Sequence, residues 1–168
     1  MGYNALIDEA DKAAALALLA GLLAPTGVIS LAERVPAETQ RIYRLMDTAK
    51  LPPDLAARWA AAEEAIYART DDPLTNWAAP DLLAAAQTAG LAAELQTEED
   101  VTDVQITPAL LARWFTPASE GKPSYADHLA GQLTPAEIGA IRALCEGQML
   151  GQTVAWRGVT AYLTARVA

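Results

Sequence analysis

The sequence predicts one helix-rich α/β domain, with about seven helices packed on a small three-stranded mixed sheet. Several segments carry leucine or isoleucine every three or four residues, which is the period of a helix buried along one face. Two short stretches, near 27–33 and 91–106, are instead rich in β-branched residues, which favour strands. The 168 residues, 52% of them apolar, are enough to bury one core.

The first helix is expected from about Asp8 to Ala24. Acidic residues at its start favour the helix dipole, and Pro25 ends it. Residues 27–33 follow a turn and are short and β-branched, so they are predicted to form a buried strand.

Prolines mark the next helices. Pro36 suits the first turn of a helix that continues towards Lys50, because a missing N–H is harmless there. Pro52 and Pro53 end that helix and start another, which runs through Ile66.

A further helix, residues 81–89, is closed by Gly90 in the position after the last turn. Two strands, about 91–96 and 101–106, follow as a hairpin joined by a tight acidic turn at 98–100.

The rest of the chain is predicted to be helical. Thr107 and Ser124 begin two short helices, and Thr134 with Glu137 forms a capping box before a third. A last helix is expected over 153–167.

Composition excludes several classes of function. The formal charge is −9, from 21 acidic and 12 basic residues, which opposes direct binding to DNA or RNA. The longest apolar run, residues 13–25, is too short and too rich in alanine to span a bilayer. A single cysteine and no recognisable signal peptide lead us to expect a cytoplasmic protein.

Common catalytic and cofactor motifs are missing. The chain has neither a GxGxxG turn nor a P-loop, and one cysteine with one histidine cannot build a zinc site. A nucleophile and base pair from Cys145 and His128 is conceivable, but Cys145 follows the apolar side of its helix and is predicted to be buried. We therefore predict no catalytic residue and no metal ligand.

The acidic residues give only weak signals. Glu63 and Glu64 are adjacent on a helix and do not face each other, so they are not a catalytic pair. The run at 98–100 is predicted to be solvated, with calcium binding as a minor alternative. The most distinctive local chemistry is Gln152, Trp156 and Arg157, either an interaction surface or helix packing.

Residues 2–33 resemble a segment of class I S-adenosylmethionine-dependent methyltransferases. That segment holds an Asn-containing loop, here Tyr3-Asn4, a helix ending in Leu-Leu, a turn, and an apolar strand ending in an acid, here Glu33. It runs from the end of the family's strand four to its strand five. Residues 80–106 resemble the helix and turn that enter strand six.

The resemblance implies the distal half of a Rossmann-like domain, in which strands five, seven and six are neighbours. Its methyltransferase-like part is residues 1–106, and residues 107–168 form a helical C-terminal extension of the same 1–168 domain. The glycine-rich loop and the acid that hold S-adenosylmethionine in this family have no counterpart here. The resemblance thus implies that the chain binds the cofactor only together with the missing half.

Two functional classes follow. In the first, the chain is part of a methyltransferase-like domain, not catalytic alone, with Tyr3 and Asn4 facing a substrate. In the second, it is a non-catalytic helical interaction module appended to a larger protein, such as the RarA-type AAA+ recombination ATPases. Without earlier strands, strand 27–33 keeps an open edge, so we expect a homodimer, a missing upstream domain, or a local cover from the N-terminal residues.

Overall fold

The computed structural model describes residues 1–69, 72–118 and 123–167. Six α-helices, three short 3-10 helices and four strands occur in these ranges. They form two compact units, and the first consists of Met1–Thr39, Tyr67–Val101 and Arg157–Ala168. The second consists of Gln40–Ile66 and Thr102–Trp156.

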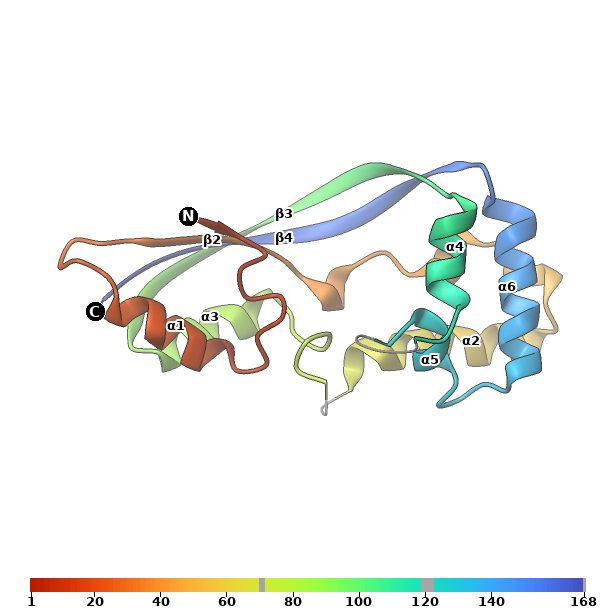
Figure 1. Ribbon diagram of the computed structural model, residues 1–168, viewed down its shortest axis with the longest axis horizontal. Helices are drawn as coiled ribbons and strands as arrows, with labels where there is room; N and C mark the ends of the chain where they lie inside the picture. The colour runs from red at the N-terminus through yellow and green to blue at the C-terminus, as the bar shows by residue number, and fades with distance from the viewer. Residues whose placement is uncertain (70–71, 119–122, 168) are drawn as a thin grey trace. The chain divides into compact units, whose positions relative to one another are not determined.

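The sheet is mixed, as predicted, but it has four strands rather than three. Its strands are β1 (Gly2–Tyr3), β2 (Ile29–Arg34), β3 (Leu91–Gln105) and β4 (Thr153–Val167). Their order across the sheet is β1-β2-β4-β3 (Figure 1). β1 runs parallel to β2, whereas β4 runs antiparallel to it, with Leu163 opposite Leu31.

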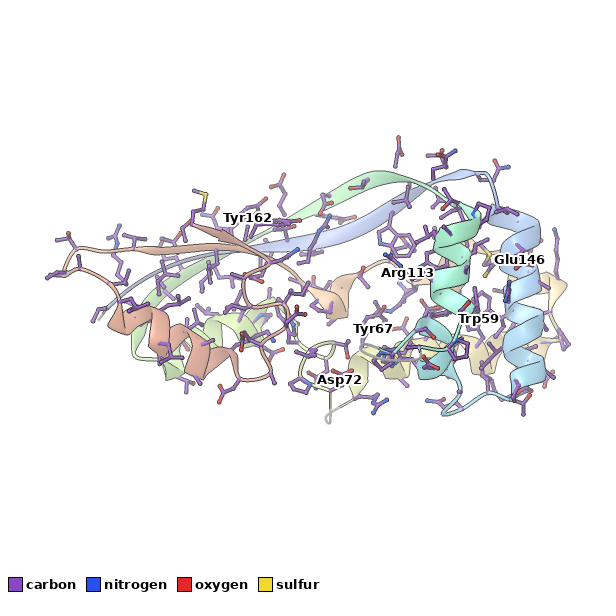
Figure 2. The ribbon with its side chains drawn as sticks, in the orientation of Figure 1. Trp59, Tyr67, Asp72, Arg113, Glu146 and Tyr162 are labelled. Carbon is purple, nitrogen blue, oxygen red and sulfur yellow. The ribbon has the colours of Figure 1, made fainter. Side chains whose placement is uncertain are left out.

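One face of the sheet carries the core of the first unit. Alternate residues of β2 and β4 are buried, because successive side chains of a strand point to opposite faces. Two helices that contact each other, α1 (Lys12–Gly21) and α3 (Ala79–Thr88), contribute Leu16 and Leu82 to the same core (Figure 1). The other face is open, with Tyr162 43% exposed on the side away from these helices (Figure 2).

The predicted hairpin at 91–106 is wrong, because residues 91–105 form the single strand β3. A tight hairpin turn needs residues that adopt a positive φ, usually glycine or asparagine, and the stretch Thr97-Glu98-Glu99-Asp100 has neither. The acidic side chains instead lie along the strand, where Arg34 and Arg157 come close to two of them.

The predicted last helix is also wrong, because residues 153–167 form the strand β4. Ala161, Leu163 and Ala165 are buried while Tyr162 and Thr164 are exposed, which is the period of a strand. The helical extension predicted for 107–168 therefore ends at Met149.

The second unit is built from helices. They are most of α2 (Pro53–Ala68), α4 (Pro108–Phe115), α5 (Tyr125–Leu129) and α6 (Pro135–Met149). Trp59, Leu129 and Ile141 are fully buried at its centre. Thr107 and Ser124 cap α4 and α5, as predicted.

The helix predicted from Pro36 towards Lys50 does not form. The chain makes three 3-10 turns instead, η1 (Pro36–Glu38), η2 (Ile42–Leu45) and η3 (Thr48–Lys50). In a continuous helix, the N–H groups of Ile42 and Tyr43 would donate to carbonyl groups of the preceding turn. Here they donate to the carboxylate of Glu63 instead, so η2 can begin without a helix before it.

Residues at the N-terminus cover part of the edge of β2. Gly2 and Tyr3 pair with Leu31 and Ala32, and the main-chain N–H of Asn4 donates to the carbonyl of Ala32 at 2.8 Å. Covering of this strand edge by the N-terminal residues was one of the three alternatives expected from the sequence. A homodimer stays a prediction.

Candidate functional site

The carboxyl ends of the parallel strands β1 and β2 meet at one edge of the sheet, where open α/β sheets bind ligands. Asn4 follows β1 with a φ of 49°, in the left-handed region that asparagine tolerates. Its Oδ1 accepts a hydrogen bond of 2.9 Å from the main-chain N–H of Arg34. The Asn4 side chain thus ties the two strand ends together.

Glu33 lies at the same edge and is fully buried. Its carboxylate accepts hydrogen bonds from the main-chain N–H groups of Ala5, at 2.8 Å, and Leu6, at 3.2 Å. Burial raises the pKa of Glu33, while these hydrogen bonds and the charge of Lys12 oppose the rise. The buried carboxyl group therefore fixes the turn that follows β1.

Lys12, at the start of α1, is only 7% exposed. Its Nζ donates to the carbonyl oxygens of Glu9, at 2.9 Å, and Pro73, at 3.2 Å, and lies 4.9 Å from the centroid of the Trp77 ring. Burial lowers the pKa of Lys12, and the charges of Glu33 and Glu9 oppose that change. Because Lys12 and Glu33 both shift towards their neutral forms, desolvation outweighs their mutual attraction.

An open pocket of about 560 Å³ lies beside Lys12, within the usual size range for small-molecule sites. It is lined by Ala10, Asp11, Lys12, Ala13, Pro73, Asn76, Trp77, Asp81 and Ala85. Asp11 and Asp81 each accept a main-chain N–H at the start of a helix. Among the described residues, the indole Nε1 of Trp77 has no hydrogen-bond partner. The charged side chains around the pocket thus already have structural roles.

On the open face of the sheet, Arg34 forms a bidentate ion pair with Asp100, with N–O distances of 2.5 and 2.8 Å. Burial lowers the pKa of Arg34, but hydrogen bonds with Asp100 and Tyr3 outweigh it and raise the pKa overall. The negative charge of Glu98 raises the pKa of Tyr162 on the same face. Tyr3, a predicted site residue, thus joins a polar group that the sequence alone does not single out.

A second buried carboxylate organises the helical unit. Glu63 is 1% exposed and accepts hydrogen bonds from the main-chain N–H groups of Ile42, at 2.5 Å, and Tyr43, at 3.1 Å. The hydroxyl of Tyr125 donates to it at 2.7 Å and accepts from the Trp59 indole N–H at 2.7 Å. Burial also raises the pKa of Glu63. Because both carboxylate oxygens already accept hydrogen bonds from the chain itself, this network positions η2.

Glu64, the next residue, points to the surface, as expected for adjacent helix positions. Its carboxylate is 40% exposed and lies 3.0 Å from Arg41 and 2.9 Å from Arg44. Glu63 and Glu64 therefore do not act together on one ligand or substrate.

The structure does not bring Gln152, Trp156 and Arg157 together on one face. Trp156 and Arg157 are neighbours on β4, so their side chains point to opposite faces of the strand. The Trp156 ring lies 5.8 Å from that of Trp114, whereas Arg157 is 69% exposed and 3.7 Å from Glu99.

Cys145 is fully buried in α6, and burial raises the pKa of its thiol to about 12. A thiol with this pKa is not a nucleophile at neutral pH. Within the described ranges, no group of His, Cys, Asp and Glu side chains is arranged to hold a metal ion.

The burial of Glu33 and Glu63 was not predicted, although the sequence carries a signal for each. Glu33 continues the alternation of Ile29 and Leu31, which places it on the buried face of its strand. Glu63 follows Trp59 by four residues and so shares the apolar face of α2.

No family model matches the chain, and no curated protein matches it at a significant level. Among the described helices, none combines the length and apolar character needed to cross a membrane.

Proposed function

We propose that this chain is the distal, cofactor-free portion of a class I S-adenosylmethionine-dependent methyltransferase-like domain. The strand order β1-β2-β4-β3 carries the proposal. In that family strands five, seven and six are neighbours, and by their place along the chain they correspond to β2, β4 and β3. The sequence resemblance assigns β1 to the end of strand four.

In this role the chain supplies one wall of a substrate pocket. Tyr3 and Asn4 lie at the carboxyl end of β1, the edge at which open α/β sheets place ligands. Tyr3 is 65% exposed, so its ring is available to another molecule or domain. Asn4 and Glu33 act as positioning residues that hold this edge in shape.

The residues at this edge do not fit S-adenosylmethionine by themselves. The Glu33 carboxylate is buried against the N–H groups of Ala5 and Leu6, and the Asn4 oxygen is used by Arg34. No described strand end carries a glycine-rich turn that brings main-chain N–H groups to a cofactor. The proposal therefore assigns cofactor binding, and with it catalysis, to the missing half.

The reading frame ahead of Met1 tests this proposal. Expression of the chain together with the segment encoded upstream should give S-adenosylmethionine binding in a calorimetric titration. A glycine-rich strand, turn and helix is expected in that segment. A frame that begins at Met1, or a longer protein that does not bind the cofactor, contradicts the proposal.

The alternative is a non-catalytic interaction module appended to a larger protein, such as an AAA+ ATPase. The observation that favours it is the helical unit, which has its own core around Trp59 and Ile141 and lies largely outside the resemblance. An AAA+ module encoded upstream, without a glycine-rich methyltransferase loop, supports this alternative over the first.

A further inference from the structure

The sheet of the first unit ends in a long strand that has a neighbour on one side only. β3 is last in the order β1-β2-β4-β3, so among the described strands it pairs with β4 alone. Within the described ranges, residues 92–99 take part in no main-chain hydrogen bond other than those of the sheet itself. Every second residue of this stretch thus turns its N–H and C=O outward, which is the arrangement that accepts an added strand.

All charged residues of this edge strand segment are acidic. Residues 92–101 contain Glu94, Glu98, Glu99 and Asp100 and no Lys, Arg or His. Asp100 is paired with Arg34, and Glu99 lies 3.7 Å from Arg157. Glu94 and Glu98 are both exposed, and no ion pair is found for either among the described side chains. The hydroxyl of Tyr162 donates a hydrogen bond to Glu98, which leaves the charge of Glu98 without a cation beside it.

The two faces of the strand differ. Glu94, Glu98 and Asp100 share one face because they are separated by even numbers of residues, and this is the open face that carries Arg34. Ala93 and Leu95 are half-buried against the core on the other face. An added strand would meet carboxylates on one side and aliphatic groups on the other.

We propose that residues 92–101 of β3 bind an extended basic segment of another protein, which joins the sheet as an additional strand. The segment alternates Lys or Arg, opposite Glu94 and Glu98, with apolar residues beside Ala93 and Leu95. Antiparallel pairing of two copies of β3 places like charges near one another, which is unfavourable. The same carboxylates therefore oppose self-pairing and select a basic partner.

The first test uses a labelled peptide of about nine residues, the length of a strand, that alternates lysine and valine. Fluorescence anisotropy with the full chain should show binding that weakens as salt is raised. A peptide of the same composition with its lysines grouped, and one with glutamate for lysine, should bind weakly. Equal binding of the alternating and grouped peptides overturns the proposal, because it shows attraction by charge alone.

Variants of the chain locate the site. Glu94→Lys should weaken binding of the alternating peptide by roughly threefold to tenfold. Glu38→Lys makes the same charge change at an exposed position of η1 and should leave binding unchanged. Thermal unfolding checks that both variants fold. An equal effect of the two substitutions overturns the proposal.

Peptides methylated on their main-chain nitrogens test strand addition directly. Methylation of alternate nitrogens on the edge that faces β3 should abolish binding, and methylation of the opposite set should not. Equal tolerance of the two sets, or a dimer of the chain formed through residues 92–101, contradicts the proposal.

Discussion

The carboxylate of Glu33 accepts the main-chain N–H of Leu6, which lies 3.2 Å from each of its oxygens. Replacing Glu33 by alanine leaves buried N–H groups without an acceptor and Lys12 without its nearby negative charge. We expect Glu33→Ala to lower the free energy of unfolding by about 2–4 kcal/mol, measured by urea denaturation. Glu38→Ala, at an exposed position, should cost less than about 0.5 kcal/mol. Similar losses in the two variants argue against a structural role for Glu33.

The acidic pair on α2 predicts opposite pH dependences. Burial raises the pKa of Glu63, so the folded chain holds this proton more tightly than the unfolded chain does. The contribution of Glu63 to stability therefore falls as the pH rises above the ordinary value of 4.5. Glu63→Gln, which resembles the protonated form, should gain stability relative to the native chain as the pH rises from about 4.5 to 7.

Glu64→Gln is the matched control. Burial opposes ionisation of Glu64, but hydrogen bonds with Tyr43 and Arg41 outweigh it and lower the pKa below 4.5. Its stabilising contribution is therefore present above 4.5 and is lost as the pH falls through the lowered value. Glu64→Gln should become less stable than the native chain as the pH rises through this acid range. The same pH trend in both variants would contradict the assignment of Glu63 as buried and Glu64 as exposed.

Leu31 tests the core of the first unit. It is 6% exposed and lies opposite Leu163 in the sheet. Leu31→Asp should destabilise the domain by several kcal/mol, on the order of 3–5, because a charge in this core has no partner. Ser30→Asp, on the open face of the same strand, should cost less than about 1 kcal/mol. A loss below about 1 kcal/mol for Leu31→Asp would show that β2 is not part of a packed core.

The first helix carries the prediction of self-association. Leu18 and Leu22 are 75% and 83% exposed on or just after α1, and they form an apolar surface that a second copy of the chain would cover. Sedimentation of the isolated chain should therefore show a homodimer at high concentration. Leu18→Glu with Leu22→Glu should shift it to a monomer, and a native chain that stays monomeric contradicts the prediction.

Local signals in the sequence predicted three helix starts and one helix end, whereas the helix expected from Asp8 begins only at Lys12. Thr107, Ser124 and Thr134 each place a side-chain oxygen on a main-chain N–H of the following turn, and Gly90 has a φ of 75° after α3. These features depend on residues three or four apart, so they can be recognised without knowledge of the fold.

The long strands could not be assigned in this way. β3 and β4 lie side by side in the sheet although they are far apart in the sequence. The acidic run within β3 resembles a turn, and only the position of Arg34 beside it explains why these residues can lie in a strand. The alternation of Ala161, Leu163 and Ala165 was a usable strand signal, but alanine and leucine also favour helices. Pairing of β4 with β2 and β3, which the local sequence does not reveal, makes this segment a strand.

The candidate site was predictable only in part. The sequence placed Tyr3 and Asn4 at the end of a strand, yet the partners of Asn4 and Tyr3 come from β2, some thirty residues away along the chain. Gln152, Trp156 and Arg157 were grouped because they lie close together in the sequence, and the strand β4 turns Trp156 and Arg157 to opposite faces.

The central claim is that this chain lacks a cofactor site of its own, and calorimetric titration with S-adenosylmethionine tests it most directly. The titration uses the isolated chain, with folding verified by circular dichroism, and is repeated with S-adenosylhomocysteine. We expect no binding of either compound, because the Glu33 carboxylate and the Asn4 oxygen are already used by main-chain N–H groups and no glycine-rich loop is present. Binding of S-adenosylmethionine with micromolar affinity by this chain alone would contradict the account.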